Sequence, residues 1–393
     1  MKNGIFEEES CVLRAKINMK SSNMNMRDPI MYRILKKKHP RTKNEWCIYP
    51  TYDWTHGQCD YIEQISHSLC SLEFENRRPL YNWYLDQIFE NNKIRPKQIE
   101  FSRLNLSHTI TSKRKIQYLI EKNVISSWDD PRILTISGLR RRGYTSLAIK
   151  NFIQKIGITK RKNLIDTSLL EFRIREHLNK ISPRVMVVLK PIKLVIDNYS
   201  INSTEWLEAD NNPENQKYGC RKIPFSKFLY IEENDFLEKK VKKFFRLSIG
   251  DEVRLKNAYI IKANFVVKNS NGKIKEIHCT YDPKSQSRKR NKNENKKRVK
   301  TTIHWVSIKH SIPIKIYLYH QLFSIKNPFK EHINLKSMEK IVAYAEPSLQ
   351  KAKKGDRFQF QRIGYFYADV DLNNNKEEVI FHKTAFLKDQ WKK

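Results

Sequence analysis

The chain has 393 residues, with 76 lysines and arginines against 42 aspartates and glutamates, so its formal net charge is +34. This length allows roughly two to three domains, and the charge favours a polyanionic partner such as RNA. No apolar run approaches the roughly 20 residues that are needed to span a membrane, and the first ten residues are acidic. We therefore expect a cytoplasmic protein with no signal peptide and no membrane contact.

The cysteines and histidines give no indication of a metal site. The six cysteines include no Cys-x-x-Cys pair, and the eleven histidines show no His-Glu-x-x-His pattern. We therefore expect reduced thiols and no bound structural metal. The positive charge also has a second explanation, because a general enrichment in lysine would raise it without any RNA partner.

The first hundred residues predict a mixture of short strands and helices. Extended segments are predicted at residues 11–17, 28–33, 47–51 and 99–104. The apolar run 47–51 is typical of a buried parallel strand. Helices are predicted over 60–69 and 79–88, and in the second Leu80, Tyr84 and Ile88 share one face.

Two better-defined helices follow. Thr145 suits the N-cap position of a helix whose buried stripe includes Ala148 and Phe152, and Gly157 can end it. Residues 168–178 repeat this apolar spacing.

After residue 182 the pattern changes to short β-rich runs. Val185, Val187 and Leu189 alternate with other residues, and prolines and an Asn-Gly pair punctuate the rest of the chain. Many short strands with frequent turns predict all-β barrels, with an α-to-β boundary near 182. The basic, Asn-rich run 284–300 predicts a loop, which suits a phosphate backbone or a solvated run of charge equally well.

The most informative segment is 100–145. Here Thr111, Ser112 and Lys113 form a loop before a predicted helix, and such a lysine can place a point charge where negative charge develops on phosphoryl oxygens. Alone, this triplet is common in solvated basic turns. Trp-Asp-Asp-Pro-Arg at 128–132 and the Ser-Gly-Leu-Arg-Arg-Arg-Gly-Tyr-Thr run at 137–145 follow it, which makes a chance match a poor explanation.

In this order, the motifs resemble those of the glutamine–tRNA ligase family of class I aminoacyl-tRNA synthetases. The resemblance covers essentially the whole chain and also rests on residues 6–8, 13–17, 26–29, 46–53, 55–56, 67–74, 303–307, 345–349 and 358–366. It implies an α/β remnant of a class I nucleotide-binding (Rossmann-like) domain, a helical connector and all-β anticodon-binding barrels. The implied divisions are 1–50 (the remainder of an acceptor-binding insertion), 51–126 (the second half of the catalytic domain, with its signature loop), 127–181 (the connector) and 182–393 (two barrels).

The activity implied by the resemblance is ATP-dependent activation of L-glutamine and its transfer to the terminal adenosine of the tRNA for glutamine, with Mg²⁺ accompanying ATP. A glutamate–tRNA ligase and a non-catalytic tRNA-binding remnant are the alternatives. The family's first nucleotide-fold segment, with its His-Ile-Gly-His-type motif, would lie upstream of Phe6. We therefore expect an incomplete isolated chain that needs a complementary N-terminal fragment.

The resemblance also implies roles for individual residues. Tyr52 falls where the family contacts glutamine, and a phenol suits a neutral amide because it can donate or accept a hydrogen bond. The implied ATP contacts are Ser71, Arg103, Leu104, Thr111, Ser112 and Lys113, with Lys113 the expected catalytic residue. The implied tRNA contacts are Thr159, Lys160, Arg161, Lys162, Asn163, Leu164, Ile165 and Asp166, and the anticodon-reading positions are Arg184, Arg221, Gln359 and Arg362.

Two positions depart from the family pattern. Thr111 stands where the family's loop usually has Met, so we expect weaker packing there but unchanged electrostatics. Asn76 stands where the family has an Asp close to the acceptor stem. The amide lacks the acceptor-only character of a carboxylate, which puts discrimination at that point in doubt.

Overall fold

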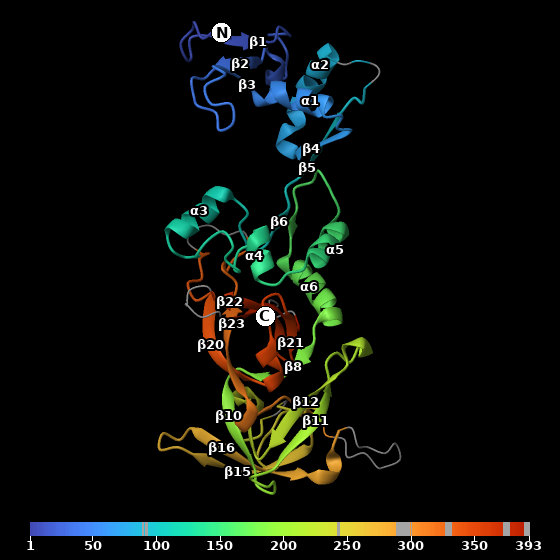
Figure 1. Cartoon of the computed structure of the whole chain (residues 1–393), viewed down its shortest axis with the longest axis vertical. Helices are drawn as coiled ribbons and strands as arrows, with labels where there is room; N and C mark the ends of the chain where they lie inside the picture. Colours follow the sequence, from blue (N-terminus) through green and yellow to red (C-terminus); the bar gives the residue numbers. More distant parts are fainter. Residues whose placement is uncertain are drawn as a thin grey trace. The chain divides into compact units, whose positions relative to one another are not determined.

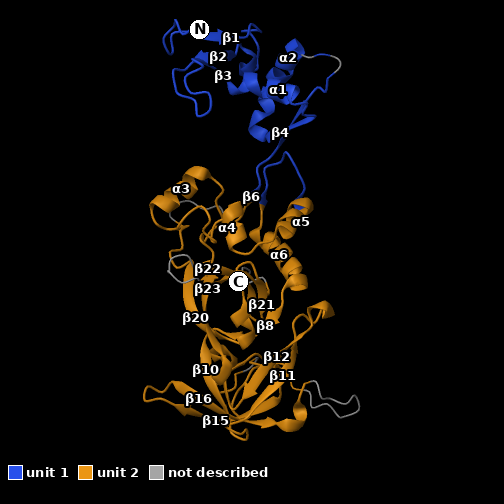
Figure 2. Cartoon of the chain, in the orientation of Figure 1, with its two compact units in different colours: residues 1–105, 156–164 blue, residues 106–155, 165–393 orange. Residues whose placement is uncertain are grey.

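The computed structural model describes residues 1–88, 90, 93–241, 244–287, 299, 301–326, 332–371 and 378–388. Over these ranges the chain forms two compact units, which are unit 1 (1–105 with 156–164) and unit 2 (106–155 with 165–393) (Figure 2). Most of the basic run 284–300 lies outside the described residues. Within the same ranges, no helix is both long and apolar enough to cross a membrane.

Unit 1 begins with a small antiparallel sheet of order β1-β2-β3. The bounds are β1 Val12–Arg14, β2 Ile30–Ile34 and β3 Ile48–Pro50. Asp28, in the left-handed region at φ 40°, makes the turn into β2, and its carboxylate accepts a hydrogen bond of 2.7 Å from the Ile17 N–H. The prediction of a buried parallel strand at 47–51 was wrong, because β3 folds back antiparallel to β2 and is partly exposed.

A strand–helix–strand unit follows. Its elements are α1 Tyr52–Ile62, β4 His67–Ser71, η2 Leu72–Arg77, α2 Arg78–Ile88 and β5 Lys97–Phe101. The predicted helix over 79–88 is confirmed as α2, and β4 and β5 pair in parallel around this crossover. The predicted helix over 60–69 was wrong. Gln64 adopts φ 56°, which α-helix does not allow, so α1 ends before it and the chain turns into β4.

The β4–β5 pair has one buried and one open face. Ser68 and Glu100 are buried beneath it, whereas Leu69 and Ile99, directly opposite each other in the register, are 66% and 39% exposed. The buried residues Leu80 and Tyr84 of α2 instead form a cluster with Ala15, which follows β1. The half-exposed parallel pair is the α/β remnant expected from the sequence.

Unit 2 begins with helices. They are α3 Lys113–Glu121, α4 Ile136–Arg141, α5 Ser146–Ile156 and α6 Thr167–Ile181, while β6 Asn105–Leu106 and β7 Leu164–Ile165 pair where the chain passes from one unit to the other. The predicted limits of α5 are confirmed, since Thr145 Oγ1 accepts the Ala148 N–H at 3.3 Å and Gly157 follows at φ 71°. In α6, Leu170, Ile174 and Leu178 are buried.

The rest of the described part of unit 2 consists mainly of β structure, in barrel-like, half-closed sheets (Figure 1). One sheet contains β17 Thr302–Ile303, β14 Glu252–Leu255, β15 Ile260–Lys268, β16 Ile274–Asp282, β10 Pro191–Ile196, β13 Phe228–Glu232 and β18 Val306–Ser307, in this order. Another contains β8 Arg184–Val185, β21 Arg357–Phe360, β22 Gly364–Asp371, β23 Glu378–Phe386, β19 Ile312–Tyr319, β20 Met338–Ala345 and β9 Val187–Val188. A ribbon of β11 Thr204–Asp210 and β12 Cys220–Ser226 accompanies them.

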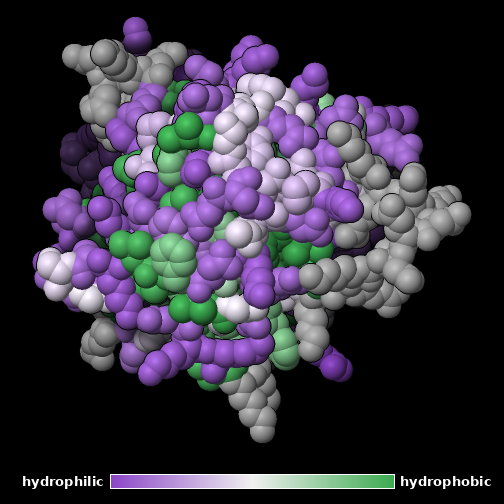
Figure 3. Space-filling view, turned by 90° about the horizontal axis from the view of Figure 1, so that it is seen from below, coloured by the Kyte–Doolittle hydropathy of each residue, from purple (hydrophilic) through white to green (hydrophobic). Residues whose placement is uncertain are grey.

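The chain enters the β region between two apolar cores. Val185 and Val187 belong to the core of the sheet that contains β21–β23, whereas Met186 and Val188 belong to the core of the sheet that contains β10 and β13. The predicted alternation therefore holds, but both faces of this segment are buried. The end of the molecule drawn in Figure 3 is mainly hydrophilic, with apolar side chains in small groups, as for a surface that faces water.

Candidate functional site

In unit 1, Tyr52 lies at the start of α1 with its ring held between two others. The ring centroids of His56 and Phe74 lie 5.1 and 5.4 Å from that of Tyr52, which is 55% exposed. Partial burial, assisted by the nearby thiol of Cys70, raises the pKa of the Tyr52 phenol. The phenol therefore stays protonated at neutral pH and can donate a hydrogen bond to a neutral polar ligand.

A polar cluster fixes the His56 ring beside Tyr52. His56 Nε2 lies 2.8 Å from Ser68 Oγ and 3.2 Å from Asp60 Oδ2, and the Tyr81 hydroxyl donates to Asp60 at 2.9 Å. Ser68 and Asp60 contact the same ring nitrogen of His56. The arrangement is therefore not a Ser-His-Asp relay, in which the serine and the aspartate contact different ring nitrogens. The sequence assigned no role to His56, although its i+4 spacing from Tyr52 puts both on one face of α1.

The unit 1 residues predicted to contact ATP lie at one edge of the β4–β5 pair. Ser71 ends β4 opposite Phe101, and Arg103 and Leu104 follow β5, so the parallel register brings these segments to the same strand ends. Arg103 is exposed, and among the described residues its guanidinium makes one long ion pair, of 3.9 Å with Glu73. A cation at the carboxyl end of parallel strands can meet an anionic ligand.

The segment from Thr159 to Asp166 is divided between internal contacts and free surface. Lys160 Nζ lies 2.7 Å from Glu75 Oε1 and 3.3 Å from Glu100 Oε2, so its charge is occupied within unit 1. Arg161 and Lys162 are exposed. Among the predicted tRNA contacts, the structure therefore leaves these two cations accessible, while Asp166 caps α6 through its contact with the Ser168 N–H.

Glu100 explains why Lys160 is held. It is 2% exposed and accepts hydrogen bonds from the Arg78 guanidinium at both oxygens and from Gln98 Nε2 at 2.9 Å. The hydrogen bonds from Arg78 lower the pKa of Glu100 to about 2. A buried carboxylate in this state needs cations around it.

Asn76, the position where the sequence departs from the family pattern, accepts a hydrogen bond of 2.8 Å at its backbone carbonyl from Asn23 Nδ2.

In unit 2, the signature loop precedes α3. Thr111 and Lys113 are exposed, and Ser112 occupies the N-cap position with an extended backbone. The partial positive charge of the helix start adds to that of Lys113, which suits an anionic ligand. The buried face of α3 belongs to a cluster with Leu322 and Phe323, residues that follow β19. Part of the β region thus supports the loop.

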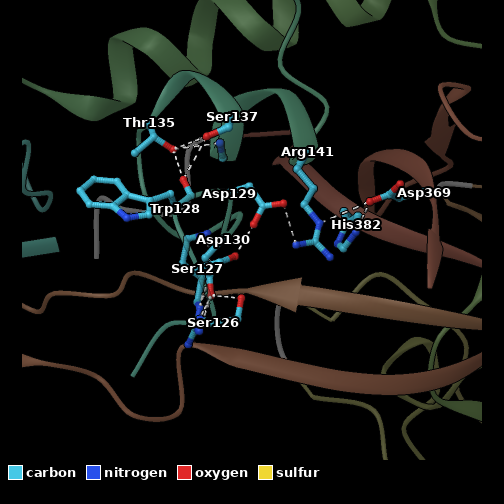
Figure 4. A network of polar contacts seen from close by, with 12 residues as sticks. Ser126, Ser127, Trp128, Asp129, Asp130, Thr135, Ser137, Arg141, Asp369 and His382 are labelled. Carbon is cyan, nitrogen blue, oxygen red and sulfur yellow. Dashed lines mark hydrogen bonds and ion pairs between the residues drawn. The ribbon is translucent and has the colours of Figure 1, made fainter. Parts of the chain in front are cut away.

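The Trp-Asp-Asp-Pro-Arg motif that follows is structural. The buried Asp130 accepts hydrogen bonds from the Ser126 N–H and from Arg132 Nε and Nη2, at 2.7–3.0 Å. The Trp128 carbonyl accepts from Thr135 Oγ1 at 2.6 Å (Figure 4). These contacts close the turn that leads into α4.

A cavity of about 520 Å³ opens among the β strands of unit 2. It is lined by Arg184, Asp210, Pro213, Lys256, Asn257, Thr302, Gln359, Gln361 and Arg362. Three of the four predicted anticodon-reading residues therefore line one cavity. The fourth, Arg221, does not line it and forms a bidentate ion pair with the buried Glu346. Lys256, Asn257 and Thr302 were missed because they lie outside the motifs of the resemblance, and Gln361 was not singled out although it lies within the 358–366 motif.

The cationic side chains of this cavity are held in place from behind. Arg184 Nη2 donates to Asn179 Oδ1 and Glu214 Oε1, each at 3.0 Å. Arg362 donates to both carboxylate oxygens of the buried Asp235. Gln359 Nε2 donates to the Tyr365 hydroxyl at 3.0 Å, which leaves its carbonyl as an acceptor. Guanidinium and amide groups that are fixed around a cavity can hydrogen-bond to the edges of splayed nucleic-acid bases.

Comparison with known proteins finds matching family models along most of the chain. Residues 1–180 match the family model "tRNA synthetases class I (E and Q), catalytic domain", and residues 182–282 and 302–369 match two models described as "tRNA synthetases class I (E and Q), anti-codon binding domain". The whole chain aligns with proteins named glutamine–tRNA ligase. That of Rhodopirellula baltica is 46% identical, with 65% of its length covered. Those of Clostridium kluyveri and Pseudomonas putida are 43% and 46% identical, with 71% and 69% covered.

Proposed function

We propose, from the premise that the chain belongs to the class I aminoacyl-tRNA synthetases for glutamate and glutamine, that it acts as a glutamine–tRNA ligase. The reaction would activate L-glutamine with ATP and transfer it to the terminal adenosine of the tRNA for glutamine. The family uses ATP, and Mg²⁺ would accompany the nucleotide. The six cysteines, all unpaired, support a cytoplasmic site of action.

The observation that carries this proposal is the cavity shared by Arg184, Gln359 and Arg362. Its mixture of guanidinium groups and amides offers forked donors and paired donor–acceptor groups, which single-stranded bases require for recognition. We assign these residues to anticodon reading, with Lys256 and Gln361 as additions from the structure. Arg221 would act indirectly, because it is fixed by the buried Glu346 and donates to the carbonyl of Asp210, which lines the cavity.

We assign the other substrate contacts within each unit separately. In unit 1, Tyr52 would bind the glutamine amide through its protonated phenol, and Ser71, Arg103 and Leu104 would contact ATP. In unit 2, Thr111, Ser112 and Lys113 would contact the ATP phosphates, with Lys113 stabilising the charge that develops on them. Within 159–166, Arg161 and Lys162 would contact the tRNA backbone, and Lys160 would position the segment through Glu100.

The test is glutamine-dependent ATP–pyrophosphate exchange followed by charging of the tRNA for glutamine. Because the chain spans 65–71% of the length of the relatives named above, we propose one arm with the chain alone and one with an added fragment of a relative that supplies the remaining length. Glutamine activation in either arm supports the proposal. Activation of glutamate instead would identify a glutamate–tRNA ligase. Binding of tRNA without activation in both arms would identify a tRNA-binding protein.

A further inference from the structure

Three consecutive arginines at the end of α4 have different environments. The Arg142 guanidinium turns inward and lies 5.5 Å from the ring centroid of Tyr319. Arg141 lies between two carboxylates, with Nη1 3.2 Å from Asp129 Oδ2 and Nε 3.4 Å from Asp369 Oδ2 (Figure 4). Arg140 is exposed and has no side-chain partner among the described residues.

Arg140 and Arg141 line a second cavity in unit 2, of about 300 Å³, which is separate from the one assigned to the anticodon. Asp129 and Ser137 contribute from the α4 side, and Lys354 and Asp369 contribute from the β21–β22 side. Neither the signature loop nor the anticodon-reading residues line it.

The charges around this cavity are unbalanced. Asp369 already has Arg141, Lys354 at 3.1 Å and His382 at 3.4 Å as partners, and Asp129 has Arg141 and the Ser127 hydroxyl. Burial lowers the pKa of His382, so its ring adds no charge at neutral pH. The lining thus holds three permanent cations against two carboxylates, and the unmatched cation is Arg140.

The backbone that presents the arginines is held rigidly. Gly143 (φ 92°) packs so closely on β22 and β23 that a Cβ there would lie 2.4 Å from Tyr367 Cβ and 2.8 Å from Thr384 Oγ1. The Thr384 hydroxyl donates to the Arg142 carbonyl at 2.7 Å, and Arg357 Nε donates to the Gly143 carbonyl at 3.3 Å. A preformed site binds its ligand at a lower cost in conformational entropy.

We propose that this cavity binds one phosphodiester of the tRNA backbone, at a point separate from the anticodon. Arg140 and Lys354 would contact the phosphate, and Arg141 would hold the two carboxylates in place. This inference rests on the proposed function, because it names a further contact to the same tRNA.

The lining favours a backbone phosphodiester over a free nucleotide. One excess positive charge matches the single negative charge of a phosphodiester, whereas the two carboxylates would repel a polyphosphate. The Asp129 carboxylate, whose side chain is 46% exposed, can also accept a hydrogen bond from a ribose 2′-hydroxyl, the group that separates RNA from DNA.

The experiment measures binding of a transcript of the tRNA for glutamine by fluorescence anisotropy, with the full chain, between 50 and 300 mM salt. Arg140→Gln and Lys354→Gln remove one cation each. Lys275→Gln, an exposed change on β16 that touches neither cavity, is the matched control. We expect each cavity variant to lower the slope of log affinity against log salt by about one and the affinity at 100 mM salt roughly tenfold.

A second arm replaces single phosphates of the transcript by uncharged analogues. We expect one such replacement, outside the anticodon loop, to weaken binding of the transcript to the parent chain but not to the Arg140→Gln variant. If Gln359→Ala weakens binding as expected for the loss of an anticodon reader while Arg140→Gln keeps the full salt slope, this inference is overturned and the proposed function stands. If the parent chain does not bind the transcript at all, both are overturned.

Discussion

Arg362 and Asp235, which are 127 residues apart in sequence, form a bidentate ion pair, with Nη2 2.8 Å from Oδ1 and Nη1 in contact with Oδ2. Asp235 is 2% exposed, whereas Arg362 also lines the large cavity. A residue chosen for base reading thus also neutralises a buried carboxylate. We expect Arg362→Ala to lower the free energy of unfolding by about 3 kcal/mol, because it leaves that charge without its main partner.

Chemical denaturation of the single and double variants checks this. Asp235→Asn combined with Arg362→Ala removes the charge as well as its partner, so it should recover part of the loss. If the double variant is as unstable as the single one, the ion pair is not the cause.

Gln359→Ala tests base reading with less effect on the fold, because among the described residues the Gln359 side chain makes a neutral hydrogen bond, with Tyr365, and no ion pair. We expect binding to the tRNA for glutamine to weaken by about 1–3 kcal/mol, the range for a base-reading contact. Gln350→Ala, an exposed change that lines neither described cavity, is the matched control. An equal loss for tRNAs with unrelated anticodons would contradict a reading role.

Lys113→Ala tests the signature loop. Its charge should count mainly in the transition state, so we expect glutamine-dependent pyrophosphate exchange to slow by about 10²–10³-fold while tRNA affinity stays near that of the parent chain. The assay uses whichever arm of the exchange experiment is active. Lys122→Ala, at the other end of α3, removes the same charge away from the loop. Normal exchange in the Lys113 variant would remove it from the catalytic residues.

The Glu100 cluster predicts a pH dependence of stability. Because hydrogen bonds from Arg78 lower the folded-state pKa of Glu100 to about 2, below its ordinary value of 4.5, the stabilisation is complete above pH 4.5 and is lost as the pH falls toward 2. We expect Glu100→Gln to destabilise the chain by about 2 kcal/mol at pH 7. The difference between parent and variant should shrink below pH 4.5, as measured by urea unfolding. A constant difference would contradict the assignment.

Gly143→Ala tests the close packing of α4 on β22 and β23. Because the new Cβ would overlap Tyr367 and Thr384, we expect a loss of about 3 kcal/mol or more in the free energy of unfolding. Gly157→Ala is the control, since Gly157 also has positive φ but nothing within 4 Å of the added Cβ; only about 1 kcal/mol of backbone strain is expected. Thermal melts of both variants decide whether overlap, rather than φ, dominates.

Local elements with clear sequence signals could be predicted without the structure. The Thr145 cap and Gly157 predicted the limits of α5, and the apolar spacing of 79–88 predicted α2. The resemblance also selected Arg184, Gln359 and Arg362, which the structure brings to one cavity. The predictions of α5 and α2 are confirmed because caps and helical periodicity depend on neighbouring residues, whereas the base-reading role of the three cavity residues stays a prediction.

Features that depend on partners distant in sequence became clear from the folded chain alone. It shows β3 antiparallel to β2, α1 ending before Gln64, Lys160 engaged with Glu100, Arg221 engaged with Glu346, and Lys256 and Gln361 at the cavity. It also gives different environments to the three consecutive arginines Arg140, Arg141 and Arg142. Charge and periodicity predict whether such side chains have polar or apolar surroundings. Which carboxylate, ring or ligand each one meets depends on strand pairing and on packing between segments distant in sequence.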